Sequence, residues 1–89
     1  MEKLMYENPY FQAQKGLVLL KSSIHTLLSA KYPSGLRNVD IGKALGIYTG
    51  HKGHEGHISR TLLEIMQNEG VIEQKEDKKW YLKVDEEDN

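Results

Sequence analysis

The sequence predicts a small α+β domain that is mainly helical, with three helices followed by a β-hairpin. Apolar residues recur at helical spacing over residues 11–31, and two shorter helical patterns follow within residues 36–70. Two short apolar runs around a charged turn then read as paired strands. A chain of 89 residues supports one core. We therefore expect one domain over residues 1–84 and an acidic, disordered tail at residues 85–89.

The first helix is expected over residues 11–31. Its apolar positions follow the spacing of an amphipathic helix, at Leu17, Leu20, Ile24, Leu27 and Leu28. Asn8-Pro9 predicts a turn before the helix, and Tyr32-Pro33-Ser34-Gly35 ends it because proline cannot continue the hydrogen-bond ladder. Glycine costs about 1 kcal/mol relative to alanine inside a helix, so an entry near Lys15 or Gly16 is an alternative.

The second helix is predicted to begin after Arg37, with Asn38 as its N-cap and Asp40 in its first turn. Gly46 is expected to end this helix. Its apolar stripe consists of Val39, Ile41, Ala44 and Leu45.

The third helix is predicted over residues 57–69, with His57 or Ser59 as its cap. The side chains expected to face the core are those of Ile58, Leu62, Ile65 and Met66. Between the second and third helices, residues 48–56 contain three glycines and no apolar period, so they are predicted to form a loop.

The two strands are expected at residues 71–73 and 80–84, joined by a turn at residues 75–79. Because side chains alternate along a strand, Trp80, Leu82 and Val84 should share one face.

The formal net charge of −1 conceals an uneven distribution of charge along the chain. Residues 10–60 hold seven Lys and Arg against two acidic residues, whereas residues 61–89 hold four Lys against nine acidic residues. Local charge sets the field that a phosphate meets, so the first part favours an anionic partner. An ordinary solvated surface is the alternative interpretation.

Several classes of protein are disfavoured by what the sequence lacks. The absence of cysteine excludes disulfides and thiolate metal sites. No run approaches the roughly 18 apolar residues of a membrane span, and residues 1–7 lack the pattern of a secretory signal, so a cytoplasmic protein without a membrane partner is expected. No nucleophile elbow, paired carboxylates or nucleotide phosphate-binding loop is present, and we expect neither an enzyme nor a cofactor.

The order of elements is that of a winged helix-turn-helix domain. Leu36-Arg-Asn-Val-Asp-Ile-Gly-Lys-Ala-Leu-Gly-Ile47 resembles the first helix of that motif in bacterial and archaeal DNA-binding domains. Leu62-Leu-Glu-Ile-Met-Gln-Asn-Glu-Gly-Val-Ile-Glu73, with Trp80-Tyr-Leu82 after a charged hairpin, resembles their recognition helix and wing. The resemblance covers residues 15–84. It departs from the simple motif at residues 48–56, which are longer than its usual turn of 3–4 residues.

The resemblance implies that the third helix enters the major groove of DNA. Its outward residues would be His57, Arg60, Thr61, Glu64, Gln67 and Asn68, which include types that read base edges. The N-terminal half of a recognition helix reaches deepest, which favours Arg60, Thr61 and Glu64. A solvated helix face is the alternative. The complete predicted DNA-binding set is Arg37, Lys43, Lys52, His54, His57, Ser59, Arg60, Thr61, Glu64, Lys75, Lys78 and Lys79.

Two parts of that set have alternative interpretations. The glycine- and histidine-rich loop before the third helix could bind a phosphate through backbone N–H groups, could hold zinc through His51, His54, Glu55 and His57, or could simply be mobile. The spacing of these histidines matches no established zinc motif. The lysines of the hairpin turn could contact phosphates or could serve only to solubilise the turn.

We therefore expect a double-stranded DNA-binding protein, either a transcriptional regulator or a DNA-binding subunit. The alternatives are a winged helix that binds another protein and a module that binds RNA. A homodimer is also expected, because one such module covers little DNA. Its predicted interface is an aromatic arm containing Met5, Tyr6, Tyr10 and Phe11, which could instead cap the core of the same chain.

Overall fold

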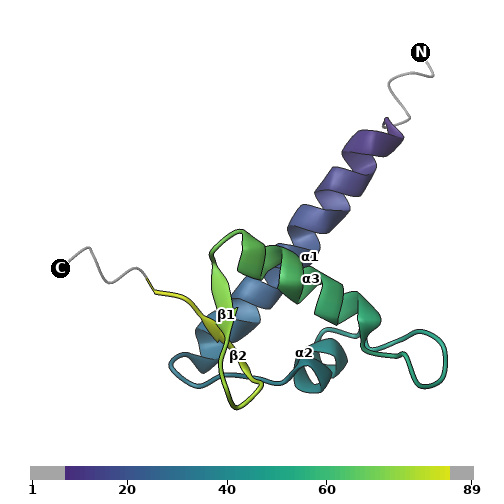
Figure 1. Cartoon of the computed structure of the whole chain (residues 1–89). Coiled ribbons are helices and arrows are strands. Elements are labelled where there is room, and N and C mark those ends of the chain that lie inside the picture. The colour runs from purple at the N-terminus through teal and green to yellow at the C-terminus, as the bar shows by residue number, and fades with distance from the viewer. Residues whose placement is uncertain (1–7, 85–89) are drawn as a thin grey trace.

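The computed structural model describes residues 8–84. The predicted acidic tail and the arm residues Met5 and Tyr6 lie outside this range. Five elements follow one another along the chain (Figure 1): α1 at Pro9–Lys31, α2 at Asn38–Ala44, α3 at His57–Asn68, β1 at Ile72–Gln74 and β2 at Trp80–Leu82. The prediction of a mainly helical α+β fold with three helices and an antiparallel hairpin is confirmed. This arrangement is compatible with a winged helix.

Helix α1 begins two residues before the predicted start and continues through Gly16. Proline occupies its first turn, and the side chain of Asn8 accepts a hydrogen bond of 2.8 Å from the backbone N–H of Tyr10. Its fully buried residues are Ile24 and Leu28, both in the C-terminal half. The N-terminal turns of α1 extend beyond the other elements (Figure 1).

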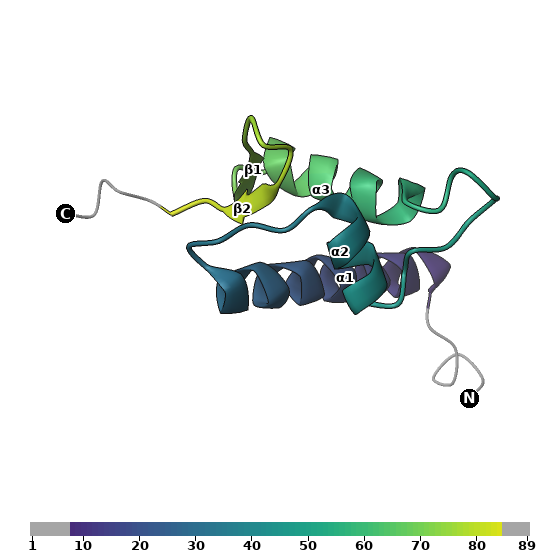
Figure 2. The ribbon, with the colours of Figure 1, turned by 90° about the horizontal axis from the view of Figure 1, so that it is seen from below.

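All five elements contribute to one hydrophobic core. Helix α3 and the hairpin lie together on one side of α1, with α2 beside them (Figure 2). The buried apolar side chains are those of Ile24, Leu28, Ile41, Leu62, Leu63, Met66, Ile72 and Trp80. No helix within residues 8–84 combines the length and apolar composition needed to cross a bilayer.

The core-facing stripe of α3 differs from the predicted stripe by about one residue of rotation. Ile58, predicted to face the core, is 43% exposed, whereas Ser59 and Leu63 are completely buried. A polar side chain can occupy a buried position when its hydrogen bonds are satisfied, and the Ser59 hydroxyl satisfies this condition. The prediction is confirmed for Leu62 and Met66, which are buried, and wrong for Ile58; Ile65 is half-buried.

A small polar cluster joins the starts of α2 and α3. Ser59 Oγ donates a hydrogen bond of 2.7 Å to Asn38 Oδ1, and Asn38 Nδ2 donates one of 3.1 Å to the carbonyl oxygen of Gly56. Asn38 is the first residue of α2, so the N-cap is Arg37 and the predicted Asn38 cap is wrong. Gly56 is the N-cap of α3, and no side chain caps this helix. The prediction that His57 or Ser59 caps it is therefore wrong.

Gly42 allows the loop after α2 to pass close to the helix. A Cβ atom at this position would lie 2.9 Å from Cδ1 of Tyr48 and 3.1 Å from Oγ of Ser59. Gly56 is equally confined, since its Cβ would lie 2.6 Å from Nδ2 of Asn38. The base of the loop is therefore fixed by close contacts at both ends.

The hairpin is attached to the segment before α2. Residue Leu36 exchanges two backbone hydrogen bonds with Trp80, of 3.0 and 2.7 Å, and β1 pairs with β2 in the register Ile72 with Leu82. Strand β1 has its predicted length but begins one residue later than predicted, whereas β2 ends two residues before its predicted end. Val84 lies beyond β2 and is 47% exposed, so the predicted strand face ends at Leu82, and Ala44 of the predicted α2 stripe is also exposed.

Candidate nucleic-acid interface

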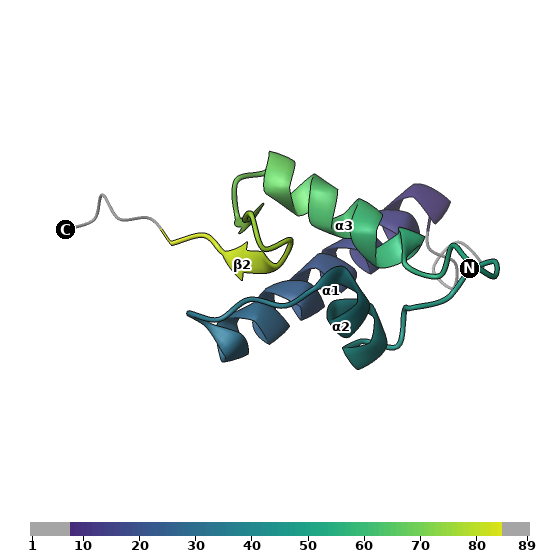
Figure 3. The same cartoon turned by 60° about the horizontal axis from the view of Figure 1, so that its bottom comes forward.

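A groove of about 440 Å³ lies between the start of α2, one face of α3 and the hairpin. Figure 3 shows how α2, α3 and β2, which contribute residues to this groove, are arranged. Its floor includes the aromatic rings of Tyr48 and Trp80, and three basic side chains come from three different elements. The lining residues are Arg37, Asn38, Val39, Tyr48, Arg60, Glu64, Gln67, Gln74, Lys78 and Trp80.

Arg37 is held at the edge of the groove by an ion pair with Asp40. Its Nε and a terminal nitrogen donate hydrogen bonds of 3.0 and 3.2 Å to the two carboxylate oxygens. This hydrogen bonding raises the pKa of Arg37 and lowers the pKa of Asp40. The pair is exposed to solvent, so Asp40 orients the guanidinium and also reduces the field that an anion meets.

The hairpin turn places Lys78 on the opposite wall. Lys78 has a φ of 71°, a left-handed conformation that is uncommon for a residue with a Cβ atom. Two hydrogen bonds hold the turn: the N–H of Lys78 donates to the carbonyl of Lys75 at 2.9 Å, and the side chain of Gln74 donates to the carbonyl of Lys78 at 3.1 Å. The backbone geometry thus fixes the direction from which Lys78 approaches the groove.

Three residues of α3 face the groove at helical spacing. Arg60, Glu64 and Gln67 lie one turn apart on the same side, and all three are exposed. Within residues 8–84, neither Arg60 nor Glu64 has a hydrogen-bond or ion-pair partner. Their donors and acceptors are therefore available to a ligand. Thr61 is exposed on α3 but does not line the groove.

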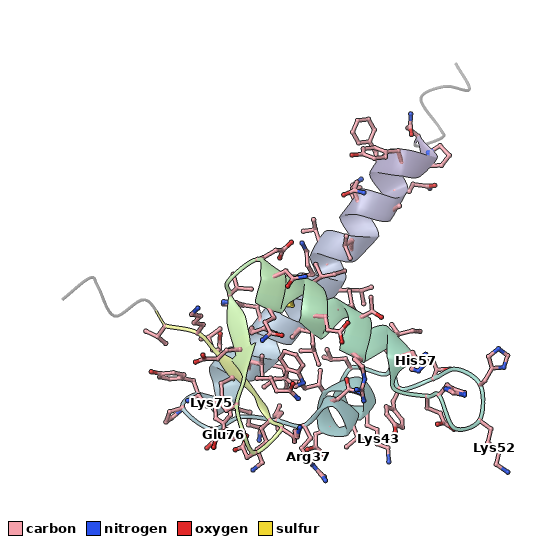
Figure 4. All side chains as sticks on the ribbon, viewed as in Figure 1. Arg37, Lys43, Lys52, His57, Lys75 and Glu76 are labelled. Carbon is pink, nitrogen blue, oxygen red and sulfur yellow. The ribbon has the colours of Figure 1, made fainter. Side chains whose placement is uncertain are left out.

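The loop between α2 and α3 carries a separate part of the predicted set. Figure 4 shows Lys52 far from the hairpin lysine Lys75 and directed away from the body of the protein. The N–H of Gly53, a predicted phosphate donor, donates to both carboxylate oxygens of Glu55 at 3.1 Å. The pKa of Glu55 is lowered by hydrogen bonds from its own backbone N–H and that of Gly53. The backbone N–H of Gly53 is thus bonded to the loop's own carboxylate and not left open to a phosphate.

The histidines of this loop form no metal-binding group in the described part of the chain. The rings of His54 and His57 meet edge to face with centroids 5.0 Å apart. Among residues 8–84, no three His, Asp or Glu side chains converge as potential metal ligands.

The remaining predicted lysines lie outside the groove on either side of it. The ammonium group of Lys43 lies 5.5 Å from the ring centroid of Tyr48, and that of Lys75 lies 4.4 Å from the ring centroid of Tyr81. Lys79 is an exposed residue of the hairpin turn. These side chains could extend a basic surface from the groove along both edges.

The structure corrects one predicted binding residue and adds several. Ser59 is completely buried and bonded within the fold, so it is not available to DNA. The sequence analysis missed the groove positions of Gln74, Tyr48 and Trp80. Strand pairing was the available signal, because Gln74 lies opposite Trp80 across the hairpin.

Comparisons of the chain with protein-family models, with curated proteins and with solved structures find no match.

Proposed function

We propose that this protein binds double-stranded DNA through the groove between α2, α3 and the hairpin. The observation that carries the proposal is that three basic side chains from separate parts of the chain line one groove: Arg37 just before α2, Arg60 on α3 and Lys78 in the hairpin turn. Phosphates attract such a cluster electrostatically, and the neighbouring amides of Gln67 and Gln74 can hydrogen-bond to bases or phosphates. A winged helix with α3 as recognition helix and the hairpin as wing is the architecture in which we expect this binding.

In the proposed complex, α3 lies in the major groove. Its 12 residues form a rod about 18 Å long, and a helix fits a major groove about 12 Å wide. Arg60 would donate to the two acceptors of guanine, and Glu64 would accept from the amino group of cytosine. Lys78 on the hairpin and Arg37 at the start of α2 would contact the phosphates that flank the groove.

The role we propose is that of a transcriptional regulator or a DNA-binding subunit. The competing proposal is a winged helix that binds another protein, and it is favoured by the carboxylates of Glu64 and Asp40, which lie in or beside the groove. A carboxylate near a phosphate costs affinity unless it meets a base donor. DNA binding through the groove requires that removing its basic side chains weakens binding to a polyanion, whereas binding to a protein partner does not require this.

Fluorescence anisotropy with a labelled mixed-sequence DNA duplex tests the proposal. The variant Arg60→Gln/Lys78→Gln removes two groove charges, and Lys31→Gln/Lys83→Gln removes two exposed charges that do not line the groove. Each phosphate contact contributes about 0.9 to the slope of log affinity against log salt. We expect the groove variant to bind more weakly and with a shallower slope than wild type, and the control variant to resemble wild type.

Two results would count against groove-mediated DNA binding. One is equal loss of affinity in both double variants, which would mean that only total charge matters. The other is no binding by wild type at about 50 mM salt, where electrostatic affinity is strong. Tighter binding to an RNA duplex of the same length would indicate that the groove binds RNA and not DNA.

A further inference from the structure

The N-terminal half of α1 carries a second apolar face that its own core does not cover. Phe11, Val18 and Leu19 are 60%, 57% and 68% exposed, and neighbouring Tyr10 is 65% exposed. Tyr10 and Phe11 therefore do not cap the core, which was one of the two roles predicted for them. Phe11, Val18 and Leu19 line a shallow apolar groove of about 350 Å³.

This second face points away from the body of the protein. At 100° per residue, Phe11, Val18 and Ser22 lie about 120° around the helix from the buried face, which includes Ile24 and Leu28. The projecting turns of α1 are visible in Figure 4. In this structure the core covers only one of the two faces.

The C-terminal half of the same face is hollow where the N-terminal half is bulky. A second groove of about 480 Å³ lies next to the first, and the two share Leu19. Small side chains predominate in its lining, which consists of Leu19, Ser22, Ser23, Thr26, Leu27, Ala30 and Leu45. One helix therefore presents both large apolar side chains and a space that could receive them.

We propose that a second copy of this chain occupies this face, with the two α1 helices antiparallel about a two-fold axis that crosses the face midway along the helix between Leu19 and Ser22. In this register Phe11 lies opposite Ala30 of the partner, and Leu19 lies opposite Ser22. The bulky half of each helix then fills the hollow half of the other, as an isologous interface requires. Lys15 falls opposite Thr26, so the two copies of Lys15 are kept apart by roughly 16 Å along the helix axis.

The available area fits a second copy that is bound weakly. The three large side chains of this face, Phe11, Val18 and Leu19, are more than half exposed and leave on the order of 300 Å² of apolar surface on each chain. Two copies, with the small residues of the second groove, stay below the roughly 1,200 Å² at which stable interfaces begin, in the range of weak association. We expect a dimer with a Kd on the order of 10 μM.

Sedimentation velocity without DNA tests the dimer from about 1 to about 200 μM, which brackets the expected Kd. We expect wild type to shift from monomer to dimer across this range. Phe11→Glu/Val18→Glu should remain monomeric, whereas Ala13→Glu/Gly16→Glu, which adds the same charges on other sides of the same projecting helix, should dimerise like wild type. Circular dichroism of both variants verifies that α1 is retained.

Disulfide trapping tests the antiparallel register, because the natural chain contains no cysteine. In the proposed dimer the two copies of Ser22 have Cα atoms about 6–7 Å apart, within reach of a disulfide. Ser22→Cys should therefore cross-link with itself. Phe11→Cys should not, because its two copies lie roughly 28 Å apart, but it should cross-link when mixed with Ala30→Cys.

Either of two results would overturn the proposal: wild type that stays monomeric at the highest concentration, or Phe11→Cys that cross-links with itself as readily as Ser22→Cys. Because no DNA is present, neither result bears on the proposed DNA-binding groove.

Discussion

Replacing Ser59 by alanine should destabilise the fold, although Ser59 was first predicted to be a surface residue. Its hydroxyl is completely buried and donates to Asn38 Oδ1 at 2.7 Å. The substitution removes one hydrogen bond, worth about 0.5–1.5 kcal/mol net, and deprives a partly buried acceptor of its donor, which costs about 1–3 kcal/mol. The Ser59 hydroxyl also lies 3.3 Å from the carbonyl oxygen of Gly56, but this oxygen still accepts from Asn38 in the variant, so only Asn38 Oδ1 is left without its donor. We expect a loss of about 1–3 kcal/mol.

Urea denaturation monitored by circular dichroism measures this loss. For a domain of this size, about 1 kcal/mol lowers the melting temperature by roughly 4–8 °C, so the effect is large. Thr61→Ala is the matched control, since Thr61 is exposed on the same helix and should change stability by less than about 0.5 kcal/mol. In a double-mutant cycle, Asn38→Ala and Ser59→Ala should be strongly non-additive. Equal stability of Ser59→Ala and Thr61→Ala would refute the reasoning.

Three further predictions concern confined backbone, pH and charge. Gly42→Ala should lower the free energy of unfolding by about 1–3 kcal/mol because its Cβ would meet the loop, whereas Gly16→Ala, with nothing within 4 Å, should raise it by about 1 kcal/mol in the same urea assay. A hydrogen bond from the Tyr81 phenol lowers the pKa of Asp77, so its stabilising effect is present above the unfolded pKa of about 3.9 and is lost as pH falls through the lowered value. Wild type should therefore exceed Asp77→Asn in urea midpoint at about pH 7 and lose that advantage at about pH 2, whereas a constant difference would contradict this origin. Glu64→Gln should tighten binding to mixed-sequence DNA in the anisotropy assay, because it removes a negative charge near the phosphates, and its slope of log affinity against log salt should stay closer to that of wild type than the slope of Arg60→Gln. Unchanged affinity would place Glu64 away from the phosphates.

The order and type of elements could be predicted from sequence because each is specified locally. The apolar spacing from Leu17 to Leu28 defines α1, and Pro33 with Gly35 defines its end. Errors arose where a neighbour decides the outcome. Hydropathy placed Ile58 in the core. The side chain of Asn38, 21 residues before Ser59, accepts a hydrogen bond from the Ser59 hydroxyl and so allows α3 to bury that side instead.

The binding groove was only partly predictable for the same reason. Arg60 and Glu64 follow from helical periodicity once α3 is recognised. Their proximity to Lys78 and Gln74 depends on where the hairpin is attached, and that is decided by the paired backbone hydrogen bonds between Leu36 and Trp80. Because this attachment is made by backbone groups, no individual side chain in the sequence predicts it.

The cluster that joins Asn38, Gly56 and Ser59 has a consequence for engineering. These hydrogen bonds hold the starts of α2 and α3 together where the loop joins α3. We therefore expect the loop to tolerate a change of length without a change in the angle between the two helices. Lengthening a flexible surface loop is entropically inexpensive, about 0.6 kcal/mol per doubling. A Cβ at Gly53 would meet no atom within 4 Å, but its φ of 87° favours glycine, so a grafted epitope or fluorophore-binding peptide should be inserted beside Gly53 and not replace it. Such an insertion would allow the protein to be detected or labelled without changing the relative orientation of α2 and α3.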